Sequence, residues 1–210
     1  ETGVEVYILN RTNNSESLRN FAAFTDLGEG SVILKQNNSQ IGPGNGGPND
    51  NGSNSLFTNL TSNGSLRDID QVDNLLSSQF IFSKSLDYEK VTSARKLGTD
   101  EYEINKTLGY ISLLRRLQND EVLAVSYEYT YNGERFKVGE LTEDYQNRDE
   151  SEVIFLKLLR PSNINVSIPT WDLMMKNIYN LNATRIESEN FELKVNYRDD
   201  AVGFNNPSLN

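Results

Sequence analysis

Alternating apolar and polar residues predict short strands at the start of the chain. Val4, Val6 and Ile8 share one face of the first run, as they would in a half-buried strand. Two short apolar runs follow before the chain becomes strongly polar. The predicted strands cover residues 4–9, 21–25 and 32–34. We interpret residues 1–35 as a small N-terminal strand unit.

The clearest strand pattern lies in the middle of the chain, over residues 122–131. Its apolar face is made of alternate residues, namely Leu123, Val125, Tyr127, Tyr129 and Tyr131. Asn132 and Gly133 come next, and this pair supplies the two positive-φ residues that a type I′ turn requires. We therefore predict a β-hairpin whose second strand covers residues 135–141.

Three more strands are predicted, at residues 108–113, 153–159 and 191–197. The segment 153–159 is almost entirely apolar, as expected for a strand that is covered on both faces. In the segment 191–197, apolar and polar residues alternate, which is typical of a strand with one buried face.

Two helices are predicted where apolar residues recur every three or four positions. The apolar face of the first, over residues 68–78, is made of Ile69, Val72, Leu75 and Leu76. Asp68 or Asp70 is placed to cap it. The second has Thr170 as its N-cap, with Pro169 outside the helix. Its apolar face is made of Trp171, Met174, Met175 and Ile178.

The composition changes along the chain and divides it into parts. Residues 36–66 are rich in Asn, Gly, Ser and Pro, and we interpret them as a flexible loop. The main domain is predicted over residues 67–202, and residues 203–210 are a polar tail. The predicted fold class is α+β, an antiparallel or mixed β-sheet packed by one or two helices.

The composition also removes several classes of function. The 210 residues include no Cys and no His, which excludes disulfides, thiolate metal sites and the commonest general base. The chain has 30 acidic and 20 basic residues, and its net charge of −10 has the wrong sign for nucleic acid or an anionic membrane surface. No segment approaches the roughly 20 consecutive apolar residues of a membrane-spanning helix.

Acidic residues suggest three kinds of chemistry, each with weak support. The segment 47–58 has the spacing of a calcium loop but lacks carboxylates at its first and twelfth positions. An acidic cluster could bind divalent cations, although a charged run in a loop is usually solvated. The cluster consists of Glu140, Glu143, Asp144, Asp149, Glu150 and Glu152. Paired carboxylates could serve a glycosidase, but nothing singles out a pair. We therefore predict a protein that is not an enzyme, and assign no catalytic, metal-binding or cofactor-binding residue and no cofactor.

Aromatic residues are the candidate contacts for a partner. Tyr127, Tyr129 and Trp171 could contribute to an aromatic surface that binds a protein or a sugar. Packing of the alternating strand in the core is the simpler explanation of the tyrosines, and we give it several times more weight. Because such an aromatic surface could bind a sugar, our alternative function is a carbohydrate-binding or adhesive module of the cell surface.

Ordered segments over most of the chain resemble one family of bacterial proteins. These segments are residues 4–12 with 26–29, 87–97, 108–113, 120–125, 129–133 with 138–140, and 171–179. Together they resemble the SprA (Sov) family of gliding-motility cell-surface proteins, the outer-membrane translocons of the type IX secretion system of Bacteroidetes. The resemblance weakens between residues 36 and 65, where loop insertions are expected.

The resemblance implies a role in protein secretion and gliding motility. Members of the family form a large transmembrane β-barrel through which folded cargo proteins reach the cell surface. This chain opens almost inside a strand without an initiator Met, so we interpret it as a piece of a longer protein. It would be an extramembrane domain of that larger β-barrel protein, soluble itself, with a structural, gating or partner-docking role. The implied partners are secreted cargo, a partner outer-membrane barrel and a plug protein, at the periplasmic or extracellular face of the outer membrane.

Overall fold

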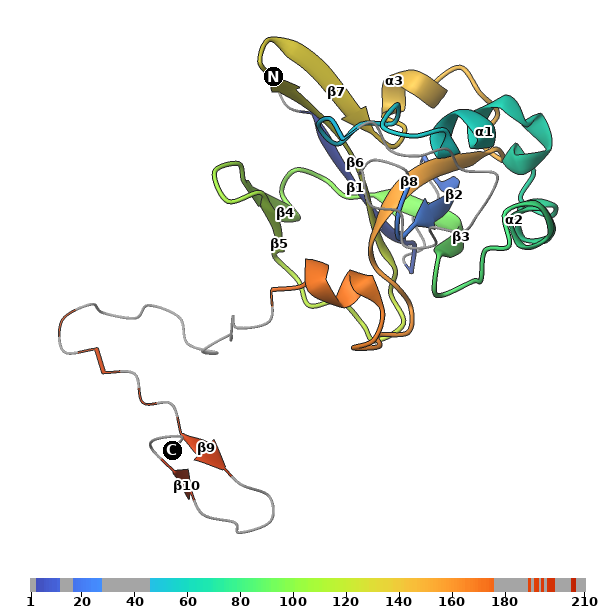
Figure 1. Cartoon of the computed structure of the whole chain (residues 1–210). Helices are drawn as coiled ribbons and strands as arrows, with labels where there is room; N and C mark the ends of the chain where they lie inside the picture. The colour runs from blue at the N-terminus through green and yellow to red at the C-terminus, as the bar shows by residue number, and fades with distance from the viewer. Residues whose placement is uncertain are drawn as a thin grey trace. The chain divides into compact units, whose positions relative to one another are not determined.

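The computed structural model describes residues 3–11, 17–27 and 46–175, together with 189, 191, 192, 194, 196–198, 205 and 206. The chain divides into two compact units, Glu1–Met174 and Met175–Asn210 (Figure 1). In the second unit, β9 (Tyr197–Arg198) pairs antiparallel with β10 (Asn205–Asn206).

The first unit is built on a mixed six-stranded sheet with the order β1-β3-β2-β8-β6-β7. Its strands are β1 (Val4–Leu9), β2 (Arg19–Phe24), β3 (Tyr88–Lys96), β6 (Leu123–Tyr131), β7 (Glu134–Val138) and β8 (Val153–Arg160). The β2–β8 pair is parallel and the other pairs are antiparallel. Because β1 also pairs with β6, five of the strands close into a ring, and β7 extends it along β6.

Every strand of the ring contributes to one of the buried clusters. Tyr7, Phe21, Val91, Ala124 and Ile154 come from β1, β2, β3, β6 and β8 in that order, and all are at most 5% exposed. Side chains alternate between the two faces of a strand, so a closed ring has one shared inner face. We identify this cluster as the interior of the ring.

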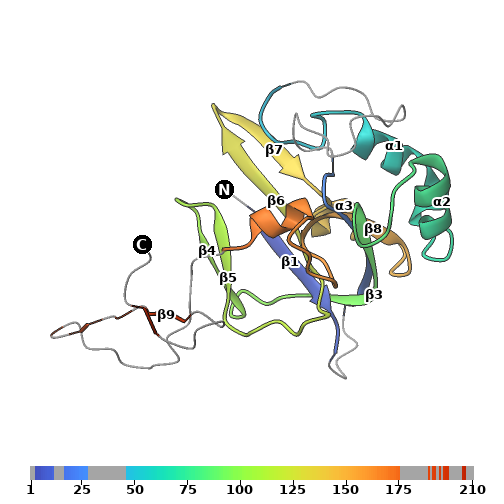
Figure 2. The ribbon, with the colours of Figure 1, turned by 60° about the horizontal axis from the view of Figure 1, so that its bottom comes forward.

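Two layers cover the outside of the ring, on opposite sides of it in Figures 1 and 2. The first layer consists of α1 (Leu56–Ser62), the 3-10 helix η1 (Gly64–Arg67) and α2 (Val72–Gln79). Their apolar residues pack on Phe24, Tyr88 and Phe155 of β2, β3 and β8. The second layer is the hairpin of β4 (Tyr102–Asn105) and β5 (Tyr110–Leu113), which packs on β1 and β6.

The α+β class with a mixed sheet is confirmed, and so is the central hairpin. Asn132 and Gly133 have φ values of 52° and 84°, as the type I′ turn requires. Tyr131 pairs with Glu134 directly across this turn. The second strand begins one residue earlier than predicted and ends at Val138, because Gly139 has a φ of 78°.

The predicted division at residues 35 and 66 differs from the division in the structure. Strands β1 and β2 do not form a separate unit, since both are strands of the six-stranded sheet. The predicted flexible loop contains α1, where Leu56 and Leu60 are buried. Asn and Ser around these leucines obscure the helical spacing in the sequence. The predicted strand 32–34 and residues 36–45 lie outside the described residues.

Several predicted boundaries were also wrong. Helix α2 starts at Val72 with Gln71 as its N-cap, because Asp68 instead accepts from the backbone N–H of Asp70 at 2.8 Å. The strand predicted at 108–113 starts at Tyr110, since Gly109 adopts a positive φ of 69° in the turn after β4.

The C-terminal helix and strand were predicted too long. Pro169–Leu173 form a 3-10 helix, η2, in which Pro169 occupies the start and Ile168 is the N-cap. Thr170 is buried instead of capping, Met174 is extended, and Ile178 lies outside the described residues.

Of the strand predicted at 191–197, Tyr197 belongs to β9, whereas Phe191 is not in a strand and is 49% exposed. Leu193 and Val195 lie outside the described residues. In the predicted tail, Asn205–Asn206 form β10. Within the described parts of the chain, no helix is both long and apolar enough to cross a membrane.

Candidate interaction site

An aromatic surface lies on the β6–β7 hairpin, and we define the aromatic face as Tyr129, Tyr131 and Phe136. Tyr129 and Phe136 face each other across the two strands, and their rings stack at 5.5 Å between centroids with an interplanar angle of 29°. Tyr127 continues the row toward the core, with its ring 6.1 Å from that of Tyr129.

The row of aromatic residues runs from the core to solvent. Tyr127 packs against the buried clusters on both outer sides of the ring, and Val138 opposite it is fully buried. Tyr129 is partly buried, and its hydroxyl donates to the carbonyl of Asn49 at 2.7 Å. Burial and the nearby Asp50 carboxylate raise the pKa of Tyr129, so its phenol stays protonated. Tyr131, near the turn, is 55% exposed.

The opposite face of the hairpin is polar. Arg135 lies 3.5 Å from the carboxylate of Glu128, and Lys137 lies 2.8 and 2.9 Å from Glu143 and Asp144. The acidic residues Glu143 and Asp144 belong to the short helix α3 (Thr142–Tyr145). The hairpin is therefore amphipathic, although part of its apolar side faces solvent.

A short loop fixes the outer edge of β7. Asp50 Oδ1 accepts from the backbone N–H of Lys137 at 2.9 Å, and the Asn51 N–H donates to the Lys137 carbonyl at 2.7 Å. The Asn51 amide bonds to both the N–H and the carbonyl of Gly139, at 2.8 and 3.0 Å. These bonds supply the partners that a further strand would give, so they hold β7 in place.

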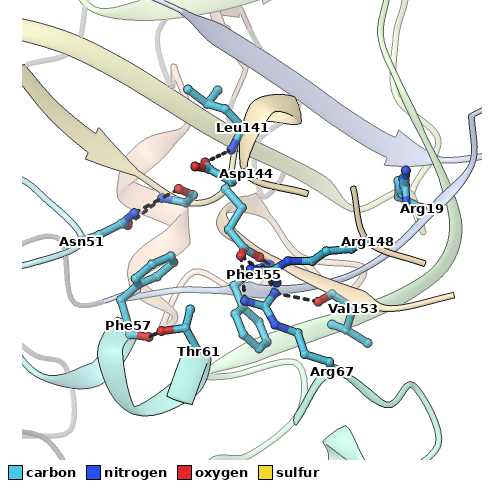
Figure 3. A network of polar contacts seen from close by, with 12 residues as sticks. Arg19, Asn51, Phe57, Thr61, Arg67, Leu141, Asp144, Arg148, Val153 and Phe155 are labelled. Carbon is cyan, nitrogen blue, oxygen red and sulfur yellow. Dashed lines mark hydrogen bonds and ion pairs between the residues drawn. The ribbon is translucent and has the colours of Figure 1, made fainter. Parts of the chain in front are cut away.

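A buried ion pair fixes the base of the hairpin. Arg67 of η1 makes two hydrogen bonds with the Glu140 carboxylate, at 2.5 and 2.7 Å, and both side chains are less than 9% exposed. Arg148 reaches the same carboxylate at 3.4 Å. Figure 3 shows the two arginines approaching from different segments, Arg67 from η1 and Arg148 from the loop after α3. The network joins the helical layer to the end of β7.

Glu140 also replaces a missing strand partner of β8. The Phe155 N–H donates to Glu140 Oε2 at 2.8 Å, and the Glu140 N–H donates to the Phe155 carbonyl at 3.0 Å. The Arg67 guanidinium lies 4.1 Å from the centroid of the Phe155 ring. Gly139 permits this approach, since a Cβ there would lie 3.1 Å from the Ser126 Cβ and 3.3 Å from the Phe155 carbonyl oxygen.

A second polar cluster gathers around Glu5 of β1 and includes Thr142 and Tyr145 of α3. The Glu5 carboxylate accepts from Tyr7, Lys96 and both the N–H and hydroxyl of Thr142, at 2.6 to 3.2 Å. Tyr7 and Tyr145 share a 2.5 Å contact between hydroxyl groups. Burial, and then the neighbouring Tyr145 and Glu5, raise the pKa of Tyr7. The carboxylate is saturated with donors, so this cluster is suited to fixing α3 on β1 rather than to proton transfer.

The structure brings together two of the three residues proposed from the sequence. Tyr127 and Tyr129 are adjacent on one face of β6, but Tyr127 serves mainly as packing. Trp171 is partly buried in η2, which follows β8, and in Figure 1 η2 (orange) lies below the sheet whereas the β6–β7 turn lies above it. Trp171 is therefore not part of the aromatic face.

Sequence reasoning missed Phe136 as a member of the aromatic face, although the predicted hairpin places it on the same face as Tyr129 and Tyr131. The signal was available in the register, because a two-residue turn places Tyr131 opposite Glu134 and Tyr129 opposite Phe136. Nothing local could reveal the Arg67–Glu140 pair, since its members lie 73 residues apart.

The acidic hypotheses find little geometric support. Glu140 is paired with arginines, Glu143 and Asp144 contact Lys137, and Asp149 accepts from the Ser151 N–H at 2.8 Å. In the segment 47–58, both oxygens of Asp50 accept from backbone N–H groups. Among the described residues, no group of three or more acidic side chains is arranged to hold a metal ion. No protein-family model matches this chain, and no curated protein matches it significantly.

Proposed function

We propose that this chain is a protein-docking domain without catalytic activity, and that it serves protein secretion across a bacterial outer membrane. The observation that carries the docking role is the aromatic face, where an exposed Tyr131 lies next to the stacked Tyr129 and Phe136. Tyrosine and phenylalanine give large contact areas at a low cost in side-chain entropy, and they are enriched in protein interfaces.

The rigid mounting of the hairpin supports this role. Asn51 and Asp50 hold the edge of β7, while Arg67 and Glu140 fix its end. A surface that is already held in its binding conformation loses less entropy when a partner binds. The aromatic face is therefore suited to recognise a folded or extended protein without rearrangement.

The secretion context is supported by the resemblance to the SprA (Sov) family. Two of the segments that carry it, 129–133 and 138–140, contain Tyr129, Tyr131 and the anchoring Glu140. In this proposal, the domain belongs to an outer-membrane translocon of type IX secretion and gliding motility. It docks cargo, the partner barrel or the plug protein at one face of the channel.

Substitutions on the hairpin test the proposal with the fold intact. We would replace Tyr131 and Phe136 by Ser, singly and together, in the full-length protein. Two quantities would be measured: secretion of a folded cargo, and the amount of the variant protein in the outer membrane. Thr130→Ala on the opposite face is the matched control. Tyr131→Ser and Phe136→Ser are expected to reduce secretion with normal assembly in the outer membrane, whereas Thr130→Ala should leave secretion unchanged. Normal secretion in a double variant that still folds would contradict the docking role in secretion.

A carbohydrate-binding module of the cell surface is the second candidate. The stacked Tyr129 and Phe136 beside an exposed Tyr131 also favour the flat apolar face of a sugar ring. Binding of the purified chain to defined glycans, lost in Tyr131→Ala but not in Thr130→Ala, would support this candidate. Failure to bind across a broad glycan panel would count against it.

A further inference from the structure

We propose that the aromatic face selects an extended polypeptide that carries Arg or Lys side chains at alternate positions. This inference rests on the proposed docking function and specifies the chemistry of the partner. It follows from the distribution of charge over the two faces of the hairpin.

The aromatic face combines rings with negative charge. Residues directly opposite in an antiparallel pair share a face, so Glu134 lies beside the exposed Tyr131. Glu134 is itself exposed, near the open end of the row. A cation placed over the Tyr131 ring would therefore also meet a carboxylate, and cation–π and ionic attraction would act together.

The basic residues of the hairpin lie on the other face. Arg135 alternates with Glu134 along β7 and is directed to the side of Glu128, 3.5 Å away. Lys137 shares that side and contacts Glu143 and Asp144. The cationic groups of the hairpin are thus turned away from the aromatic face and would not repel a basic partner there.

The spacing of the rings favours an extended segment. Tyr129 and Tyr131 are two residues apart on one strand, which corresponds to about 6.5 Å. Alternate side chains of an extended partner repeat at the same interval. The net charge of −10 would accelerate the approach of a cationic segment from a distance.

Binding of defined peptides to the whole chain tests the inference. The probe is an acetylated and amidated peptide of four Arg-Thr repeats, and the comparison is four Gln-Thr repeats. We would measure Kd by calorimetry and follow the ring resonances of Tyr129, Tyr131 and Phe136 by NMR. The Arg-Thr peptide is expected to bind, with shifts at these rings, and the Gln-Thr peptide to bind about tenfold more weakly or not at all.

Variants separate site-specific binding from general attraction to an acidic protein. Tyr131→Ala and Glu134→Gln are each expected to weaken binding about five- to tenfold. Asp120→Asn, which removes an exposed carboxylate before the start of β6, at the other end of that strand from Tyr131, is the matched control and should leave Kd unchanged. Equal weakening by Asp120→Asn would overturn the inference, because general charge attraction would then account for binding.

Three further outcomes would overturn the inference, and together they separate it from the proposed function. Equal binding of the Gln-Thr peptide would show that the face does not select cations. If neither peptide binds but Tyr131→Ser and Phe136→Ser still reduce secretion, docking stands and its partner is not cationic. If neither peptide binds and secretion is normal in those variants, the docking function itself fails.

Discussion

At the scale of single residues, Glu140 connects more of the structure than any local pattern suggests. Its carboxylate binds Arg67 and Arg148 and accepts from the Phe155 N–H, so one side chain links the helical layer, β8 and the segment after β7. Removal of one member of a buried pair leaves the other charged and unpaired, which costs more than the pair contributes.

We expect Glu140→Gln to lower the free energy of unfolding by about 3–5 kcal/mol, because Arg67 would stay buried without its counter-ion. Chemical denaturation measured by circular dichroism checks this. Glu143→Gln, at a carboxylate that is 64% exposed, is the control and should change stability by less than about 1 kcal/mol. Similar decreases in the free energy of unfolding in both variants would show that the buried Arg67–Glu140 pair contributes no more to stability than an exposed ion pair.

The lowered pKa of Glu101 makes the stability of the folded protein depend on pH. Two hydrogen bonds from Arg95, helped by the Gly98 N–H, lower the pKa of Glu101 from 4.5 to about 2. The folded protein thus binds this proton less tightly than the unfolded chain does, and its contribution to stability is lost as the pH falls from about 4.5 toward 2. In Glu101→Gln, the thermal midpoint should be lower at neutral pH and should fall less over this range. If the thermal midpoint of Glu101→Gln depends on pH in the same way as that of the original protein, Glu101 does not contribute to acid sensitivity.

At the scale of elements, the β6–β7 hairpin shows how a turn sets the register of the aromatic face. Asn132 and Gly133 both adopt positive φ, which places Tyr129 against Phe136. The double change Asn132→Val with Gly133→Val should destabilise the hairpin by about 2 kcal/mol or more, since β-branched residues resist this conformation. Asn132→Gly retains the turn and is the control. Loss of the NMR contacts between Tyr129 and Phe136 in the double variant alone is expected, whereas retained contacts would contradict the role of the turn.

The elements that were predictable are those whose signal is local. The strand at Leu123–Tyr131 and its turn were found because side-chain alternation and Asn-Gly are readable in one short window. Helix α1 was missed, since Leu56 and Leu60 sit among polar residues and are buried in a cluster that includes residues of β2, β3 and β8, which lie far from α1 in the sequence. The same holds for the aromatic face, whose members were visible but whose anchoring by Asn51 depends on contacts 88 residues apart.

At the scale of the whole molecule, closure of the sheet makes the N-terminal strands indispensable. β1 lies between β3 and β6, and β2 lies between β3 and β8. Phe21 and Tyr7 from these strands fill the interior of the ring. A chain without β1 and β2 would expose the edges of three strands and the apolar interior to water.

This arrangement predicts that a fragment of residues 67–202 cannot fold alone, although its sequence has the composition of a domain. It lacks β1, β2 and α1, so Phe155 and Ile154 of β8 would lose their neighbours on one side. Thermal unfolding followed by near-ultraviolet circular dichroism should show no cooperative transition for this fragment. The full chain is the reference and should unfold cooperatively. A cooperative transition in the fragment would mean that β3, β6 and β8 form a stable sheet without closure, and that the ring is not the unit of folding.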